Sequence, residues 1–296
     1  MRLPKIMKNT TRRIGQYGFA GRLLQRFYLW LWEPSRRYVM SGVLNPYEQD
    51  LLNQIARDGY VVIPGYFNPE ECRQAITEIE AAVGRYPTAI QIGQGSDRRL
   101  FGVQHVSPIA KRFATDPLWL RLADHYTGRR NVLFSTLANI VEANLSNSEG
   151  SGGGWHRDGF ARELKSLVYL SDVTNDNGPF HLIARSNRTR QIVRDMLDGG
   201  LAFLQNRIRN DQVQKILNRD KDRYVRLPAP AGTVLVFDTS ILHTGSPIRC
   251  GSRYALTNYI IDSTLVNKDL YESYSPYIAS IEDAETRWKT EAAASL

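Results

Sequence analysis

The sequence predicts a mainly β protein of the α+β class, with a double-stranded β-helix (jelly-roll) core and an N-terminal helical layer. Two observations support this fold class. From residue 131 onward, short β-branched and aromatic runs alternate with turn clusters, which is typical of antiparallel sheets. Before that point, the hydrophobic residues follow helical spacing. With 296 residues, 42% of them hydrophobic, the chain is long enough for one large domain.

The helical layer is predicted from spacing and capping signals. A first helix covers 46–58 and ends at Gly59, and a short strand covers 60–63. A second helix begins after Asn68, where a capping side chain, a proline and two acids follow one another, and runs to Val83. A third is expected over 116–126.

The strands of the core are predicted from the β-rich runs that follow. Turn clusters separate them, including the glycine-rich segment 146–154. A helical insertion over 187–220 interrupts the strands and is expected to cover one mouth of the barrel. The predicted strands span 132–145, 166–173, 180–184, 224–227, 233–237 and 253–261.

The predicted organisation is a basic extension over 1–45, one jelly-roll domain over 46–275 and a tail over 276–296. Residues 1–40 hold nine basic and one acidic side chain, and the other 256 residues hold 29 of each. The globular part is therefore neutral, and no nucleic-acid partner is expected. A basic amphipathic helix over 17–32 predicts either a peripheral membrane contact or, as the favoured alternative, a helix packed on the domain.

The cellular setting is predicted from the cysteines and the hydrophobic segments. Cys72 and Cys250 lie far apart and form no metal-finger spacing, so both are expected to be reduced. No run of about 20 hydrophobic residues predicts a membrane span. We therefore expect a cytoplasmic protein, with membrane association open. The oligomeric state is not predicted.

The strongest chemical signal is the segment Trp155-His156-Arg157-Asp158. If it is a strand, His156 and Asp158 project from the same face and can bind one ion. His243, which follows the strand 233–237, is the candidate for a third ligand. Two imidazoles and one carboxylate on one face of Fe(II) leave three positions open for a chelating cosubstrate and dioxygen.

Arg253 follows His243 by ten residues. A turn between two adjoining strands would bring its guanidinium back beside the metal. Guanidinium groups bind carboxylates with two hydrogen bonds, so Arg253 is the candidate for the distal carboxylate of 2-oxoglutarate.

These motifs, together with Asn177-Gly178-Pro179-Phe180 and the segment Asp58 to Phe67, resemble the phytanoyl-CoA dioxygenase family of Fe(II)/2-oxoglutarate-dependent oxygenases. The resemblance covers roughly residues 48–262. It implies His156, Asp158 and His243 as the catalytic iron ligands and Arg253 as the 2-oxoglutarate clamp. It also implies Asn139 as a polar group near the cosubstrate. The cofactors it implies are Fe(II), 2-oxoglutarate and dioxygen.

The expected function is hydroxylation of a small or carrier-linked organic substrate, with succinate and CO2 as coproducts. The alternative is a non-catalytic jelly-roll binding module whose metal is structural or absent, and Arg253 distinguishes the two. The chain departs from the family at 184–187, where many members have Pro-Gly-Ser-His. Asp158 disfavours halogenation, since the related halogenases have a small residue at that position.

Several other polar side chains keep open interpretations. Arg162 and Lys165 either bind an anionic substrate or lie on a solvated strand edge, which is the favoured alternative. Asp238 either orients His243 or caps a turn. The remaining histidines are expected to be structural or on the surface: His105, His125 and His181. The alternative for His105 is that it lines the substrate mouth.

Overall fold

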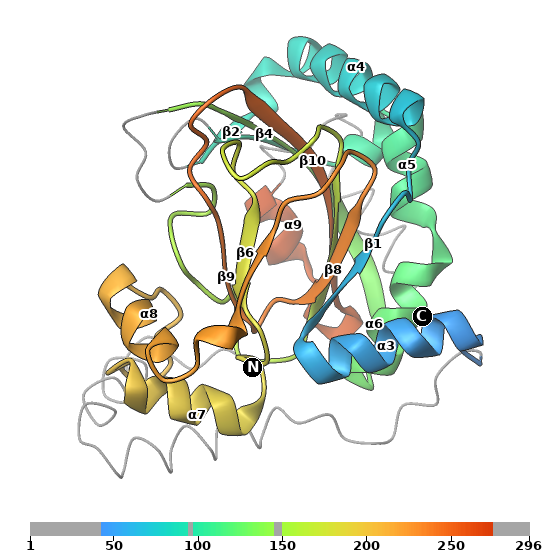
Figure 1. The fold of residues 1–296 in the computed structure, drawn as a ribbon. Helices are drawn as coiled ribbons and strands as arrows, with labels where there is room; N and C mark the ends of the chain where they lie inside the picture. The colour runs from blue at the N-terminus through green and yellow to red at the C-terminus, as the bar shows by residue number, and fades with distance from the viewer. Residues whose placement is uncertain (1–42, 94–96, 145–149, 275–296) are drawn as a thin grey trace.

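The computed structural model describes residues 43–93, 97–144 and 150–274, and its centre is a sandwich of two antiparallel sheets (Figure 1). The larger sheet has the strand order β1-β8-β5-β10-β4-β3-β2, and the smaller has β7-β6-β9. The predicted two-sheet architecture is confirmed. The strands are β1 Tyr60–Ile63, β2 Gln91–Ile92, β3 Asp97–Phe101, β4 Asn131–Glu142, β5 Leu164–Tyr169, β6 Phe180–Ile183, β7 Tyr224–Leu227, β8 Val234–Asp238, β9 Leu242–Gly245 and β10 Ser252–Asp262.

Four helices form a layer beside the larger sheet, on the side away from β6 and β9 (Figure 1). The side chain of Asn68 accepts a hydrogen bond from the backbone N–H of Glu71 at 2.9 Å, as the predicted cap requires. Hydrophobic side chains of this layer and of the larger sheet make one core cluster. The helices are α3 Pro46–Asp58, α4 Pro69–Arg85, α5 Pro108–Thr115 and α6 Pro117–Thr127.

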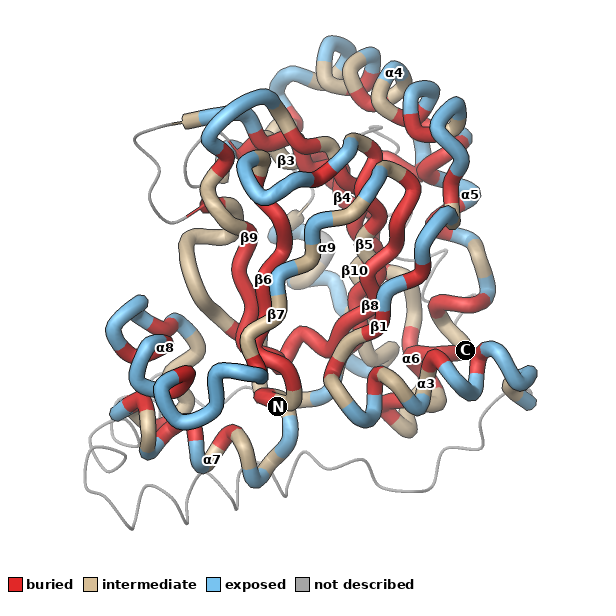
Figure 2. Tube along the Cα trace, in the orientation of Figure 1, coloured by how far each residue is buried: buried red, intermediate tan, exposed pale blue. Residues whose placement is uncertain are grey.

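Two further hydrophobic clusters hold the smaller sheet in place. One fills the space between the sheets and includes Phe180, Leu182 and Phe237. The other lies on the opposite face of the smaller sheet, where Ile183 packs against α7 Thr189–Asp198 and α8 Asn210–Leu217. Except at the sheet edges formed by β1, β2 and β7, the strands are buried along most of their length, and α7 and α8 are exposed on their outer faces (Figure 2). The smaller sheet is therefore packed on both faces.

Some elements are absent from the sequence prediction. Strand β3 contains three charged residues, and β9 is a four-residue strand with a glycine, so neither has a β-rich pattern. Helix α5 was missed although Ser107-Pro108 carries the same capping signal as Asn68-Pro69. Helix α9 Lys268–Tyr274 was also missed. The predicted amphipathic helix over 17–32 lies outside the described residues.

The state of the cysteines and the lengths of the helices can be compared with the sequence predictions. Cys72 is buried, Cys250 is exposed, and neither forms a disulfide. Within 43–93, 97–144 and 150–274, the helices are all too short or too polar to cross a membrane.

Gly59 joins α3 to β1 and allows a stability test. Its φ is +87°, and an added Cβ would lie 2.8 Å from Cδ1 of Ile241 and 2.9 Å from Oδ1 of Asn187. Gly65 also has a positive φ, +66°, but has open space around it. We expect Gly65→Ala to cost about 1 kcal/mol of unfolding free energy, and Gly59→Ala to cost a further 1–3 kcal/mol or so through overpacking. Urea unfolding measures both. Equal costs would contradict the close packing at Gly59.

Candidate metal centre

The two histidines of the predicted site are held side by side by backbone hydrogen bonds. The N–H of His156 donates to the carbonyl of His243 at 2.9 Å, and the N–H of His243 donates to the carbonyl of His156 at 2.8 Å. This isolated antiparallel bridge adds His156 to the edge of the smaller sheet, next to β9. Residues paired in this way direct their side chains to the same face, and the imidazole centroids lie 4.3 Å apart.

Both imidazoles present their Nε2 atoms as free ligands. Nδ1 of His156 lies 2.8 Å from the carbonyl of Gly154, and Nδ1 of His243 lies 2.9 Å from the carbonyl of Ile241. A carbonyl oxygen can only accept a hydrogen bond, so each Nδ1 must carry the proton. Each Nε2 is then unprotonated, and its lone pair can bind a metal. Backbone carbonyls commonly orient metal-binding histidines in this way.

Asp158 brings the third ligand atom. Its Oδ1 lies 3.5 Å from Nε2 of His156, and its side chain keeps 31% of its surface exposed. One ligand atom each from His156, Asp158 and His243 lie within 4.8 Å of one another. The sequence prediction that the three side chains meet is therefore correct in geometry, but the segment is not a regular strand. Asp158 lies in a bend and is fixed by its own N–H, which donates to the carbonyl of Thr239 at 3.0 Å.

The electrostatics of the three groups suit a cation. Burial lowers the pKa of His243 to about 3, and burial also lowers the pKa of His156, so both rings are neutral at neutral pH. Burial alone would raise the pKa of Asp158. The charge and hydrogen bond of Lys165, together with the two imidazoles, outweigh burial and lower that pKa, so the carboxylate is ionised. Two neutral imidazoles and one carboxylate are the protonation states that a divalent metal requires.

Two anchors fix the backbone around the ligands. The buried guanidinium of Arg157 donates to the carbonyls of Ser186 and Ser240, at 2.9 and 2.6 Å, and so ties the His156–Asp158 segment to the turn before β9. Asp238 accepts hydrogen bonds from the N–H and the hydroxyl of Ser240, so it caps this turn. Of the two interpretations left open for Asp238, turn capping is correct, since His243 bonds to Ile241 instead.

Arg253 lies inside the sandwich but not where the spacing predicted. It is on β10 of the larger sheet, whereas His243 is on β9 of the smaller sheet, so the prediction of adjoining strands is wrong. The chain crosses between the sheets, and Arg253 faces the smaller one. One of its Nη atoms donates to the carbonyl of Gly178 and lies near Gly245.

The guanidinium of Arg253 has unused donor capacity. Its residue is 5% exposed, and its Nε is buried without a hydrogen-bond partner. Among the described residues, no carboxylate forms an ion pair with it. A buried guanidinium without a counter-ion is costly unless a ligand supplies one. The 2-oxoglutarate carboxylate predicted for this position would do so.

Asn139 lies on the same inner face as Arg253. It is on β4, opposite Ala255 of β10, and is 8% exposed. Its amide donates to the fully buried carboxylate of Asp97, which also accepts from Arg99 at 2.5 Å. A role beside the cosubstrate stays a prediction for Asn139.

Of the two cations after the motif, Lys165 differs from the favoured expectation and Arg162 agrees with it. Lys165 is buried at 8% exposure, and its Nζ lies 2.6 Å from Oδ2 of Asp158. The solvated strand edge is therefore wrong for Lys165, whose burial depends on strand pairing that the local sequence does not reveal. Arg162 is exposed, with its guanidinium 5.5 Å from the Tyr126 ring centroid.

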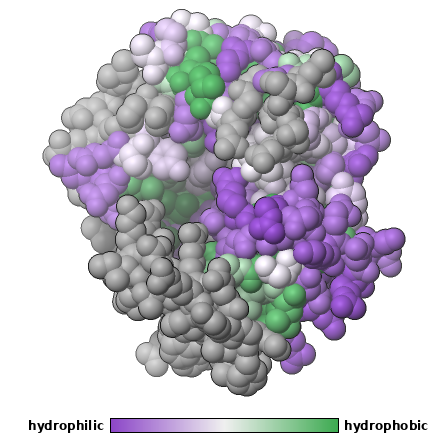
Figure 3. Space-filling model, turned by 90° about the vertical axis from the view of Figure 1, so that its left-hand side faces the viewer, coloured by the Kyte–Doolittle hydropathy of each residue, from purple (hydrophilic) through white to green (hydrophobic). Residues whose placement is uncertain are grey.

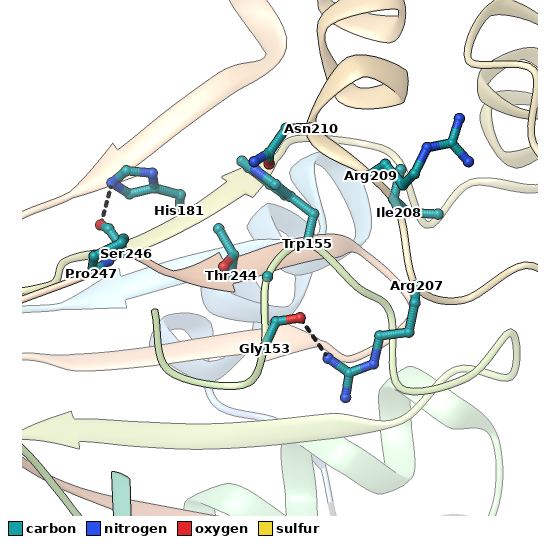
Figure 4. A pocket seen from close by; sticks show the side chains of 11 residues that line it. Gly153, Trp155, His181, Arg207, Ile208, Arg209, Asn210, Thr244, Ser246 and Pro247 are labelled. Carbon is teal, nitrogen blue, oxygen red and sulfur yellow. Dashed lines mark hydrogen bonds between the residues drawn. The ribbon is translucent and has the colours of Figure 1, made fainter. Parts of the chain in front are cut away.

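His181 is structural, as expected. Its Nδ1 lies 2.9 Å from the Tyr224 hydroxyl and its Nε2 lies 2.9 Å from the Ser246 hydroxyl. Burial lowers its pKa to about 4. It lines a cavity of about 730 Å³ on the face of the smaller sheet that is turned away from His243, together with Trp155 and Thr244 (Figure 4). The described surface on this side of the molecule is largely hydrophilic (Figure 3).

Comparisons with known proteins found a hydroxylase and a dioxygenase among the similar proteins. L-proline trans-4-hydroxylase of Streptomyces griseoviridis is 24% identical over 213 residues, which cover 64% of this chain and 77% of that protein. Ectoine dioxygenase of Bordetella bronchiseptica is 25% identical over 215 residues, which cover 66% of this chain and 68% of that protein.

Solved structures share the fold. The apo form of EctD from S. alaskensis matches with a TM-score of 0.57 and 19% identity, covering 84% of this chain and 91% of that one. The epimerase SnoN in complex with Fe3+, alpha ketoglutarate and nogalamycin RO matches with a TM-score of 0.55 and 20% identity, covering 74% and 84%.

The family model described as phytanoyl-CoA dioxygenase (PhyH) matches residues 55–254, which is more than half of the chain. The match begins in α3 and ends in β10, and it includes both histidines, Asp158 and Arg253. The chain belongs to the phytanoyl-CoA dioxygenase family and is a 2-oxoglutarate-dependent non-haem iron oxygenase.

Proposed function

We propose that His156, Asp158 and His243 hold Fe(II), that Arg253 binds the distal carboxylate of 2-oxoglutarate, and that the enzyme hydroxylates a small organic molecule. One observation carries the proposal: two unprotonated Nε2 atoms and one carboxylate oxygen converge within 4.8 Å. This donor set on one side of an ion suits ferrous iron that keeps positions open for ligands.

The second part of the proposal rests on Arg253. A metal with a purely structural role has no use for a buried guanidinium that lacks a carboxylate partner. The orphaned Nε of Arg253 supports a carboxylate-bearing cosubstrate and argues against the alternative of a non-catalytic binding module. We assign the cosubstrate carboxylate to this guanidinium.

The size of the substrate is proposed from the relatives. The names of the two relatives contain proline and ectoine, which are free small molecules. They favour a small free substrate over a carrier-linked one. Which carbon is oxidised depends on how the substrate lies beside the metal.

When bound, Fe(II) and 2-oxoglutarate use dioxygen to supply the oxidant for a C–H bond, with succinate and CO2 as coproducts. The protein holds and orients these groups. Three ligands would leave the other positions on the ion to the cosubstrate and dioxygen, and Arg253 would fix the direction of the cosubstrate. The rings of Phe180 and Phe237 lie 5.3 and 5.4 Å from the His243 ring and exclude water from its inner side.

The metal ligands give the first functional test. We expect His243→Ala and Asp158→Ala each to lower both Fe(II) affinity and succinate formation by more than about 100-fold, because even the partners of metal ligands contribute 10–100-fold. His125→Gln, in the helical layer, is the control. Metal titration and succinate release from a panel of small substrates measure the effects. Full activity in either alanine variant would refute the assignment.

Arg253 gives a second test. Arg253→Lys keeps the charge but loses the paired donors, so we expect the KM for 2-oxoglutarate to rise about 10- to 100-fold with a smaller change in kcat. Arg253→Met should raise that KM further. Steady-state kinetics with 2-oxoglutarate varied measure both variants. An unchanged KM in Arg253→Met would place the cosubstrate carboxylate elsewhere.

A further inference from the structure

Lys165 is a buried cation next to the metal ligands that the proposed chemistry does not yet use. It is on the inner face of β5, where the strand pairing places it opposite Phe237 on β8 and Tyr259 on β10. Its side chain is 10% exposed. A buried ammonium is stable only with partners, and the structure supplies two: Oδ2 of Asp158 at 2.6 Å and the Tyr259 ring, whose centroid lies 3.9 Å from Nζ.

The two oxygens of Asp158 have different surroundings. Oδ1 lies 3.5 Å from Nε2 of His156, on the side where the ligand atoms converge. Oδ2 accepts the hydrogen bond from Lys165. Within the described part of the chain, the hydrogen bond that the Asp158 carboxylate accepts comes from Lys165. The backbone of Asp158 is fixed separately through Thr239, so the lysine acts on the rotation of the carboxylate alone.

That rotation decides how many positions on a metal the carboxylate occupies. A carboxylate that binds through one oxygen leaves three of six positions free beside two imidazoles. A carboxylate that binds through both oxygens leaves two, which a bidentate 2-oxoglutarate would fill completely. Holding Oδ2 away from the ion therefore preserves one position for a further small molecule.

We propose that Lys165 is a positioning residue that keeps Asp158 bound to the metal through Oδ1 alone. This inference rests on the proposed function of the same site. The aromatic side chains around the ammonium support a fixed position: the Tyr259 ring packs edge-on against Phe101, whose ring contacts Tyr274 of α9 in the same way. The lysine is thus held by packing on one side and by the carboxylate on the other.

The position of Lys165 has two opposing consequences. Its positive charge repels a nearby divalent ion, so removing it should strengthen metal binding. Its removal also frees Oδ2 to bind the metal and to compete with 2-oxoglutarate. Lys165→Met should therefore bind metal more tightly and 2-oxoglutarate more weakly. General damage to the fold would weaken both.

The test compares the wild type with Lys165→Met, Lys165→Arg and Arg162→Met, using Mn(II) in place of iron. Loss of the free Mn(II) resonance signal measures metal affinity, and calorimetry measures 2-oxoglutarate affinity of the Mn(II)-loaded protein. We expect Lys165→Met to bind Mn(II) about tenfold more tightly and 2-oxoglutarate about tenfold more weakly. Lys165→Arg keeps a charged donor and should stay within about threefold of the wild type.

Arg162→Met removes a nearby exposed charge without touching Asp158, so it should change neither affinity. A crystal structure of Mn(II)-loaded Lys165→Met should show both oxygens of Asp158 on the metal, where the wild type shows one. Parallel weakening of both affinities, unchanged affinities, or a one-oxygen Asp158 in Lys165→Met would each overturn the inference. A wild type that binds no Mn(II) would instead refute the proposed function.

Discussion

The backbone bridge between His156 and His243 is the constraint on which the site depends. Two reciprocal hydrogen bonds, at 2.9 and 2.8 Å, join a loop residue to a strand that lies 87 positions later in the chain. Because the bridge directs both side chains to one face, the backbone alone places the two imidazoles side by side. The carbonyls of Gly154 and Ile241 then set the ring orientation from within the same two segments. The position of an ion is therefore built into the backbone.

The two sheets carry different residues of the proposed site. The smaller sheet and its bridged edge carry the histidines, and the larger sheet carries Arg253, Asn139 and Lys165 on its inner face. A cosubstrate that reaches from the ligands to Arg253 would span the gap between the sheets. Packing in that gap, by Phe180 and Phe237 among others, holds the two sheets together and also contacts the ring of His243.

Local sequence predicted that His156, Asp158 and His243 lie close together, because a short motif and a histidine after a strand are local features. The strand content of the second half and the caps at Asn68 and Gly59 were predictable for the same reason. Arg253 was identified by its spacing but placed on the wrong strand, since a jelly roll sends consecutive strands to opposite sheets. The burial of Lys165 could not be predicted. It follows from the register of β5 with β8 and β10, which depends on residues about 70 and 95 positions away.

In the proposed site, one ion and one 2-oxoglutarate share the space between His156, Asp158, His243 and Arg253. The most direct measurement is visible absorption of the protein under anaerobic conditions, as Fe(II) and then 2-oxoglutarate are added. We expect a weak visible charge-transfer band that needs both additions, saturates at one equivalent of iron, and is lost in a His243→Ala variant. A wild-type protein that gives no band, or a band that persists without His243, would contradict it.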